Sequence, residues 1–532
     1  MKGVIMKGKT KRIITLVICL TMLLSVPVTA HAAVTTEPES QLYHIMGYND
    51  NYSIFTNYVD GYELYIENDM EVNTDNIGIV TVLESENKRV EIYKQSVHTT
   101  SAEGYINYSN KFLGTANTYY DVMSWTSEGI WEDSGEPRIV YYTQWSRDAL
   151  SGIENDYNHY LCIDIPKDFY VYTVFIKTNY RITDPAEFEH YEAHFRTFIP
   201  SVKAPSFESE MVHPDDREWN SETREFYDTY FHEDAQLSWG IFEPEVDYTG
   251  FQNLDAYEEY FEYDFPVLLS YSEVKNTSIF TINQRLENAY ERGKILELTL
   301  QTNWTPEGNM IYDILDGDYD EYLHDYAETI ADFGHPVLFR LFNEMNGDWC
   351  PYSAYNYSKD TLLFREVYKY IYRIFEEEGA NENTIWIWNP NEGSFPNFKW
   401  NHTLMYYPGD EYVDIIGLTA YNTGTYYAGE TWKTFTELYS DMYSQYSEWF
   451  DHPFMITEFA CSSTGGDKEA WMKDMFRRIR NYDNIKIAIW WDGCDWDAEG
   501  NVARSYFLDE TPGTLEIFKD GIVVPWYLDV YA

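Results

Sequence analysis

The strongest constraint on the fold is a series of eight short apolar runs that follow one another after Met211, separated by longer helical segments. Each run is rich in β-branched or aromatic residues, as strands buried on both faces are. Amphipathic segments such as 361–379 and 468–482 lie between them. This alternation predicts a (β/α)8 TIM barrel over 211–532. The runs begin at Ala235, Phe265, Lys294, Pro336, Thr384, Val413, Pro453 and Ile485.

A doubly wound open sheet is the alternative fold for these eight runs. That fold places a glycine-rich, phosphate-binding turn after its first strand. The sequence after the first run is "IFEPEVDYTG", which has no such turn. The barrel is therefore preferred.

The region before the barrel has a different pattern of apolar and polar residues. Residues 37–200 contain short aromatic runs with period-two alternation, which predicts strands. The segment 184–199 has helical periodicity, with Asp184 as N-cap and Pro185 at the first helical position. We expect a smaller β-rich (α+β) accessory domain of unknown role, joined to the barrel by a linker at 201–210.

The first 32 residues have the pattern of a secretory signal peptide. Five basic residues precede a short apolar run at 13–28, and "AHA" at 30–32 fits a cleavage site. A membrane anchor is the alternative, but the run is shorter than a bilayer span and Pro27 interrupts it. We therefore expect a secreted protein with no membrane association after cleavage.

Composition restricts the partners of this chain. The formal net charge is −52 and aromatic residues make up 18% of the sequence. Such an acidic surface repels nucleic acid and anionic membranes but tolerates a neutral ligand.

Four cysteines follow the leader, namely Cys162, Cys350, Cys461 and Cys494, without metal-site spacing. A Cys461–Cys494 disulfide and free buried thiols both remain open. No motif predicts a metal or a cofactor, and nothing indicates an oligomeric state.

Chemistry-bearing residues gather where the predicted strands end. The active site of a (β/α)8 barrel lies at the carboxyl ends of its strands, and here those ends carry carboxylates, amides and aromatic rings while the strand starts stay apolar. A purely structural barrel would not need this asymmetry. The residues are Glu243, Glu273, Asn303, Trp304, Asn343, Glu344, Asn389, Asn391, Tyr421, Glu458, Trp490, Trp491 and Asp492.

Two of these residues, Glu344 and Glu458, follow the fourth and seventh strands and would face each other across the barrel mouth. Strand alternation predicts that Phe342, Arg340 and Leu338 point inward together with Glu344. Arg340 would then be buried one layer below the carboxylate and would need an acidic partner.

By the same alternation, Glu458 should share the inner face of its strand with Ile456 and Phe454. Two carboxylates separated by roughly 5 Å are the arrangement for retaining glycoside hydrolysis. One stays protonated to release the leaving sugar and the other is ionised to attack, and their repulsion moves the two pKa values apart. Arg340 would favour the ionised nucleophile.

The aromatic residues at the strand ends suit the same chemistry, since Trp and Tyr rings pack against the flat C–H faces of sugars. Trp349, Trp304, Tyr421, Trp490 and Trp491 are the candidates. Adjacent strand residues point to opposite faces, so only one of Trp490 and Trp491 can face inward.

The second half of the chain resembles glycoside hydrolase family 26, a retaining (β/α)8 family of the large clan A. The resemblance rests on four segments in combination and covers the chain from about Met211 onward. The segments are "LFRLFNEMNGDW" at 338–349, "MYYPGDEYVDIIGLTAYN" at 405–422, "PFMITEFA" at 453–460 and "AIWWDG" at 488–493.

The resemblance implies roles for individual residues. Glu344 would be the general acid/base and Glu458 the nucleophile. Tyr421 would hydrogen-bond the nucleophile, and Trp349 and Trp491 would line the subsites nearest the cleaved bond. Together these roles define a secreted endo-β-glycanase that needs no cofactor.

The chain departs from the family pattern at Asn343, where the mannan-cleaving members usually carry His. In other clan A families Asn at this position contacts the sugar 2-hydroxyl, which is axial in mannose and equatorial in glucose and xylose. We expect β-mannan as the substrate, with mixed-linkage β-glucan (lichenan) and β-1,3-xylan as alternatives. A catalytically inactive glycan-binding cell-wall protein is the rival from another class, against which the retention of both carboxylates argues. The partner would be a neutral plant or microbial β-glycan.

Overall fold

The structure is a computed structural model that describes residues 42–523, except 115–117, 249 and 306–307. Eight parallel strands form a closed barrel in chain order, and the last strand pairs with the first. Each predicted run supplies one strand, so the (β/α)8 fold is confirmed. The strands are β12 (Ser238–Phe242), β13 (Val267–Glu273), β14 (Ile295–Gln301), β15 (Val337–Leu341), β16 (Thr384–Trp388), β17 (Ile415–Thr419), β18 (Phe454–Phe459) and β19 (Ile485–Trp491).

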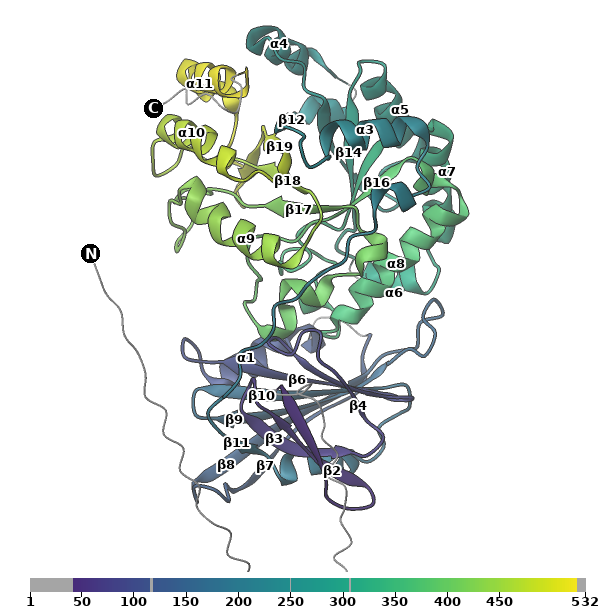
Figure 1. Cartoon of the computed structure of the whole chain (residues 1–532), viewed down its shortest axis with the longest axis vertical. Helices are drawn as coiled ribbons and strands as arrows, with labels where there is room; N and C mark the ends of the chain where they lie inside the picture. Colours follow the sequence, from purple (N-terminus) through teal and green to yellow (C-terminus); the bar gives the residue numbers. More distant parts are fainter. Residues whose placement is uncertain (1–41, 115–117, 249, 306–307, 524–532) are drawn as a thin grey trace, which may run out of the picture. The chain divides into compact units, whose positions relative to one another are not determined.

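Helices surround the barrel strands (Figure 1). Several begin at a polar N-cap, as at α9, where Thr434 and Glu437 form a capping box. These helices are α3 (Ser221–Tyr230), α4 (Gln252–Phe261), α5 (Ile279–Tyr290), α6 (Met310–Leu315), α7 (Asp320–Phe333), α8 (Thr361–Glu377), α9 (Phe435–Trp449), α10 (Lys468–Arg478) and α11 (Pro512–Val523).

The connection from β16 to β17 departs from the alternating pattern. Residues 389–414, all of which the structure describes, contain three short 3₁₀ turns and no α-helix. The turns are Lys399–Asn401, Thr403–Tyr406 and Asp410–Tyr412. The segment is a long loop at the carboxyl ends of the strands, where barrel enzymes build their active sites.

The barrel interior is filled by apolar side chains, including Leu269, Leu338 and Ile387. The prediction that Phe342 faces inward is wrong. Phe342 has a φ of +51° and packs outward, with its ring centroid 4.9 Å from that of Tyr352. The strand has already ended at Leu341, so its alternation no longer holds.

The predicted alternation on β18 is also wrong. Met455 belongs to the interior cluster, whereas Phe454 and Ile456 pack in the cluster that contains the surrounding helices. The register of β18 shifts between Ile456 and Phe459, which marks a bulge in the strand. A bulge re-aims the following side chains, and here it brings Glu458 to the inner side of the barrel despite the outward Ile456.

The β-rich region consists of two sheets that share one core. Leu64 and Ile66 of the smaller sheet pack with Val90 and Ile163 of the larger sheet. The smaller sheet contains β1 (Tyr43–Gly47), β2 (Tyr52–Asn57), β3 (Tyr62–Glu67) and β11 (Arg196–Thr197). The larger contains, in spatial order, β4 (Glu71–Asn73), β5 (Thr81–Ser85), β6 (Lys88–Ser96), β10 (Tyr170–Thr178), β9 (His159–Lys167), β8 (Pro137–Ser146) and β7 (Tyr120–Ile130).

The other face of the larger sheet contacts the barrel. Tyr160 and Phe175 on this face belong to the same buried cluster as residues of the barrel helices. The β-rich region and the barrel accordingly belong to one compact unit.

The predicted single helix over 184–199 is wrong beyond its first turn. The side chain of Asp184 accepts a hydrogen bond from the Ala186 amide, as an N-cap does, but a 3₁₀ turn at Pro185–Phe188 follows. After a four-residue helix α2 (His190–Ala193), the chain becomes β11 and pairs with β3. Pairing with a sheet edge outweighs the helical periodicity of this segment.

The segment 201–210 contains no helix or strand. Its Phe207 packs on Tyr407 and Phe450 of the barrel, with ring centroids 5.9 and 5.7 Å apart. The four cysteines after the leader are free, so Cys461 and Cys494 are not bonded to each other. The predicted signal peptide lies outside the described residues.

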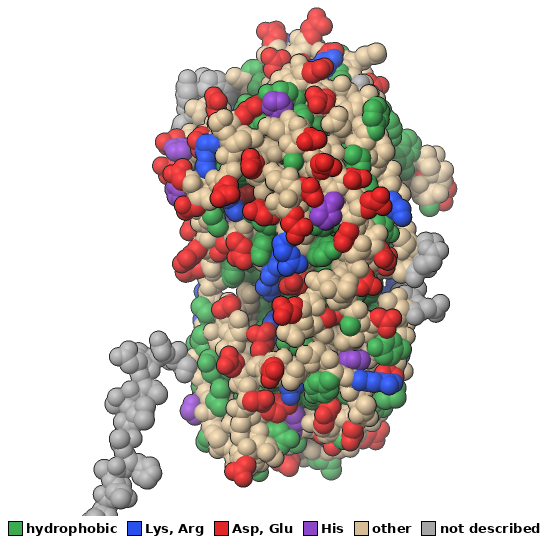
Figure 2. All heavy atoms as spheres, turned by 90° about the vertical axis from the view of Figure 1, so that its right-hand side faces the viewer, with side chains coloured by type: hydrophobic (Ala, Val, Ile, Leu, Met, Phe, Trp, Pro, Cys, Tyr) green, Lys and Arg blue, Asp and Glu red, His purple; other side chains and the backbone are tan. Residues whose placement is uncertain are grey.

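The surface is strongly acidic. Figure 2 shows Asp and Glu side chains spread over one face of the molecule, with far fewer Lys and Arg. Within the described part of the chain, no helix combines the length and apolar character needed to cross a membrane.

Candidate active site

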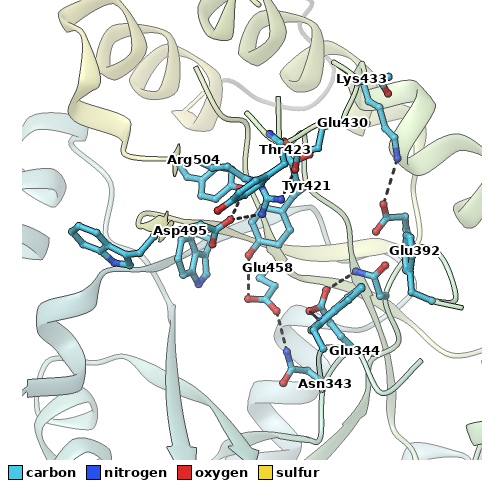
Figure 3. Close-up of a pocket in the computed structure, with 18 of the residues that line it drawn as sticks. Asn343, Glu344, Glu392, Tyr421, Thr423, Glu430, Lys433, Glu458, Asp495 and Arg504 are labelled. Carbon is cyan, nitrogen blue, oxygen red and sulfur yellow. Dashed lines mark hydrogen bonds and ion pairs between the residues drawn. The ribbon is translucent and has the colours of Figure 1, made fainter. Parts of the chain in front are cut away.

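The carboxyl ends of the barrel strands surround a cleft of about 860 Å³. The two predicted catalytic carboxylates lie in it together (Figure 3). Predicted site residues that line the cleft are Asn343, Glu344, Trp349, Asn391, Tyr421, Glu458 and Trp491. Segments far apart in the sequence thus meet at one place.

Glu458, on β18, has each carboxylate oxygen in contact with two donors. Oε1 accepts hydrogen bonds from Arg340 Nη1 at 3.1 Å and Asn343 Nδ2 at 3.2 Å. Oε2 accepts from the Tyr421 hydroxyl at 3.1 Å and from the Tyr271 hydroxyl. Four donors hold this carboxylate in one orientation, and one of them is a cation that compensates its charge.

Arg340 lies beneath the cleft on β15 and is fully buried. Its Nε is 2.7 Å from Glu297 Oε1, on β14, so the acidic partner expected from the sequence is present. Burial alone would lower the pKa of Arg340, but the charges of Glu297 and Glu458 outweigh burial and raise it. Burial raises the pKa of Glu297 to about 8 despite the opposing effect of Arg340. Arg340 therefore stays charged below the nucleophile candidate.

Glu344 has a different environment from Glu458. Its Oε1 accepts a hydrogen bond from Asn391 Nδ2 at 2.6 Å and its Oε2 accepts one from Trp349 Nε1 at 3.2 Å, and both donors are neutral. Burial, followed by the charge of Glu458, raises the pKa of Glu344 to about 8. Near neutral pH, Glu344 therefore carries a proton that it can donate.

The backbone at Glu344 adopts a sparsely populated conformation. Its φ is +55°, and its amide donates a hydrogen bond to the Asn389 carbonyl at 2.7 Å. Non-glycine residues in this left-handed region are strained and cluster at functional sites. This strained turn, held by the neighbouring strand, places Glu344 in the cleft.

Asn343 is held by three partners. Its Oδ1 accepts hydrogen bonds from Gln301 Nε2 at 2.7 Å and from the Tyr352 hydroxyl at 3.1 Å. Both acceptor bonds orient the amide so that Nδ2 points at Glu458. Asn343 therefore lies beside the carboxylate that would form the bond to the sugar.

Two predicted aromatic residues flank Glu344 and Glu458. Trp349 is 45% exposed and lies 5.3 Å from Phe395, measured between ring centroids. Trp491 stacks on Phe242 at 5.1 Å and meets Tyr421 edge-on at 6.3 Å. Rings fixed from behind and open toward a cleft are suited to pack against sugar faces.

The structure does not bring Trp304 or Trp490 into the cleft. Trp490 is completely buried, and its Nε1 donates a hydrogen bond to the Tyr506 carbonyl at 3.1 Å. It is the packing member of the Trp490–Trp491 pair, because adjacent residues on β19 point to opposite faces. Trp304 is 62% exposed and is not among the residues that line the cleft. Trp304 lies on the loop after β14, and strand alternation does not predict where a side chain in a loop points.

Several lining residues were not predicted from the sequence. Strand alternation on β13 could have identified Tyr271, because it lies two residues before Glu273, the predicted strand-end residue, and so points to the same face. The others lie in loops or next to them, where periodicity gives no direction. They include Gln301, Phe395, Tyr427, Trp496 and Arg504.

One wall of the cleft is formed by the hairpin β20 (Cys494–Trp496) and β21 (Val502–Ser505). Arg504 bridges Asp495 of the hairpin, at 2.7 Å, and Glu430 of the loop after β17 (Figure 3). Trp496 on this wall is 64% exposed. These ion pairs hold the loop after β17 against the β20–β21 hairpin, which carries the exposed ring of Trp496.

A (β/α)8 barrel with two opposed carboxylates and aromatic rings at the carboxyl ends of its strands has the fold and site of a glycoside hydrolase. Residues 268–490 match the family model described as glycosyl hydrolase family 26. The predicted resemblance to glycoside hydrolase family 26 is thus confirmed for residues 268–490.

Individual proteins are similar to parts of this chain. It is 28% identical to endoglucanase H of Acetivibrio thermocellus over 253 residues, which cover 46% of this chain and 26% of that protein. It is 40% identical to a mannan endo-1,4-beta-mannosidase of Bacillus subtilis over 97 residues, 18% of this chain and 25% of that protein. The matches thus span about a quarter of these relatives.

Among solved structures, the catalytic domain of the Bacillus sp. JAMB-750 GH26 endo-beta-1,4-mannanase is 18% identical, with a TM-score of 0.45. This match covers 59% of the present chain and 94% of that one.

Proposed function

We propose that this protein is a secreted retaining endo-β-glycanase that hydrolyses β-mannan by double displacement. The observation that carries the proposal is the unequal environment of the two carboxylates that share the cleft. Glu458 is held by four donors, including the cation Arg340, whereas Glu344 contacts two neutral donors. This inequality supports attack by Glu458 and proton transfer by Glu344.

In the first step, a Glu458 oxygen forms a bond to the anomeric carbon while the glycosidic C–O bond breaks. Glu344 gives its proton to the departing sugar oxygen. In the second step, the Glu344 carboxylate takes a proton from water as the water oxygen attacks the anomeric carbon. The ester bond to Glu458 breaks, which regenerates both side chains with retained configuration.

The decisive experiment compares wild type, Glu344→Ala and Glu458→Ala on mannan, lichenan and β-1,3-xylan, with sizing of the products. We expect both variants to lose activity by a factor of about 10² or more, because proton transfer and nucleophilic attack each contribute at least that much. Equal rates for all three proteins on every substrate would reject the proposed enzyme in favour of a glycan-binding protein. Products of mixed internal lengths would support endo action.

Mixed-linkage β-glucan is a second candidate substrate, favoured by Asn343. This residue stands where mannan-cleaving members of the family usually carry His, and its amide nitrogen lies 3.2 Å from Glu458. The longest match among the cited relatives is to a protein named endoglucanase H. A clear preference for lichenan in the substrate comparison would select this candidate and leave the mechanism unchanged.

Secretion rests on the leader at residues 1–32. Sequencing of the amino terminus of protein recovered from the culture medium tests it. We expect the mature chain to begin at Ala33.

A further inference from the structure

Helix α1 (Ala102–Ser109) of the β-rich region packs against barrel loops that border the cleft. Trp400 Nε1 donates a hydrogen bond to Ser109 Oγ at 3.2 Å, and both groups are buried. The Tyr105 ring meets Phe398 edge-on at 4.7 Å and is 1% exposed. These contacts fix α1 to the loop after β16.

Tyr108, on the same helix, is held differently from Tyr105. Its hydroxyl donates a hydrogen bond to Asp348 Oδ2 at 3.0 Å, and its ring stacks on Tyr355 with centroids 5.1 Å apart. Tyr355 is 7% exposed, whereas Tyr108 is 40% exposed. The ring is thus supported on one face by Tyr355 and meets Phe398 edge-on at 6.0 Å, and the rest of its surface is open to solvent.

Tyr108 is linked to the cleft through its hydrogen bond to Asp348. Asp348, its hydrogen-bond partner, directly precedes Trp349, whose side chain lines the cleft beside Phe395. Trp349 and Phe395 are 45% and 46% exposed. Two exposed aromatic rings of the barrel therefore line this end of the cleft, and the exposed ring of Tyr108 is joined to it through Asp348.

We propose that Tyr108 forms a sugar-binding subsite that extends the cleft onto the β-rich region. The proposal rests on the function proposed above. The ligand would be neutral sugar units of the same β-glycan chain, beyond those held at the catalytic pair. A ring fixed through its hydroxyl and its rear face loses little conformational entropy when a sugar packs on it.

The position of this subsite relative to the cleaved bond follows from Trp349. Its indole nitrogen donates to Glu344, which protonates the leaving oxygen, whereas Trp491 contacts Tyr421 on the Glu458 side. The part of the cleft lined by Trp349 therefore lies on the leaving-group side of the cleaved bond. Tyr108 would contact sugars of the departing part of the chain.

The test uses the full chain with oligosaccharides of increasing length from the best polysaccharide substrate. Tyr108→Ala should lower kcat/KM by about 3- to 10-fold on long oligosaccharides and polymer, the range of single aromatic contacts, and leave the shortest cleaved substrate unaffected. Tyr108→Phe keeps the ring and its stack on Tyr355 but removes the bond to Asp348, and should retain most of the wild-type kcat/KM at every length. This pair separates a sugar platform from a residue that only positions Trp349.

Tyr48→Ala is the matched control, since Tyr48 is 57% exposed on the β-rich region and belongs to the smaller sheet's first hairpin. It should leave kcat/KM unchanged at every length. Equal effects of Tyr108→Ala on short and long substrates, or no effect on either, would overturn the inference while leaving the proposed enzyme intact. A wild-type protein without activity on any β-glycan would instead contradict the function on which the inference rests.

Discussion

Arg340 Nη1 lies 3.1 Å from Glu458 Oε1, and the same guanidinium lies 2.7 Å from Glu297 at the bottom of the site. One buried cation thus links a structural carboxyl to the candidate nucleophile. Removing it would leave negative charge buried in the barrel without compensation, which is far more costly than losing a surface ion pair.

We therefore predict that Arg340→Met lowers the free energy of unfolding by about 3–5 kcal/mol and abolishes most activity. Adding Glu297→Gln should recover stability only at pH above about 8, where the Glu297 carboxyl would otherwise ionise without a partner, and should not recover the activity. Urea unfolding of the single and double variants, together with their kcat, measures both effects. A double variant no more stable than Arg340→Met would show that the Glu297 charge is unimportant.

The pKa of Glu344, raised to about 8 by burial and by Glu458, predicts the alkaline limit of activity. The rate should fall as pH rises through about 8, because the carboxyl then loses the proton that the leaving oxygen requires. A rate profile on polysaccharide from pH 5 to 10 tests this prediction. An alkaline limit below pH 6 would contradict the raised pKa.

The same group links stability to pH. Between its ordinary value of 4.5 and about 8, the folded state holds a proton on Glu344 that the unfolded chain has released. Stability contributed by this site is therefore lost as pH rises through that window. Glu344→Gln should remove this loss, so that its urea midpoint exceeds that of wild type at pH 8 while the two agree near pH 4.

The hydroxyls of Tyr271 and Tyr421 both donate to Glu458 Oε2. Replacing either tyrosine with Phe should lower kcat/KM by about 10- to 100-fold, since a hydrogen bond to a charged group contributes about 1.5–3 kcal/mol. The double Phe variant should lose less than the sum of the single losses, because the two donors share one acceptor atom. Strict additivity would contradict this coupling.

A buried ion cluster joins the β-rich region to the barrel. Lys177 Nζ lies 2.9 Å from Glu91 Oε1 and 2.7 Å from Asp360 Oδ1, the N-cap of α8. Burial alone would raise the pKa of Glu91, but Lys177 and Arg89 lower it to about 2. The stabilisation from this carboxylate is therefore present above about pH 4.5 and is lost as pH falls toward 2.

Lys177→Met is therefore predicted to destabilise the whole chain by about 3–5 kcal/mol at neutral pH, because two acids lose their buried cation. Tryptophan fluorescence and circular dichroism should report one shared, shifted unfolding transition. Two separate transitions, with only one shifted, would show that the β-rich region and the barrel unfold independently.

The barrel could be predicted from the sequence because its strands are buried on both faces and therefore appear as continuous apolar runs. The candidate catalytic pair stood out in the sequence for a related reason. Glu344 and Glu458 interrupt the ends of two such runs, where a barrel without a function would carry no charge.

The remaining features depended on geometry that periodicity does not encode. The bulge on β18 turns Glu458 inward although Ile456, two residues earlier, points outward. The positive φ of Phe342 ends the alternation of side chains on β15. Trp496 lies on a hairpin after the last barrel strand, and Tyr108 meets Asp348 across a sequence separation of 240 residues. Only tertiary structure brings such residues to the cleft.

The most direct test of the account is to trap the enzyme with a 2-deoxy-2-fluoro glycosyl fluoride of the preferred sugar and to locate the label by peptide mass spectrometry. We expect one covalently bound sugar per chain on Glu458, and no labelling of Glu458→Ala. A label on Glu344, or an active enzyme whose first product has inverted anomeric configuration, would contradict it.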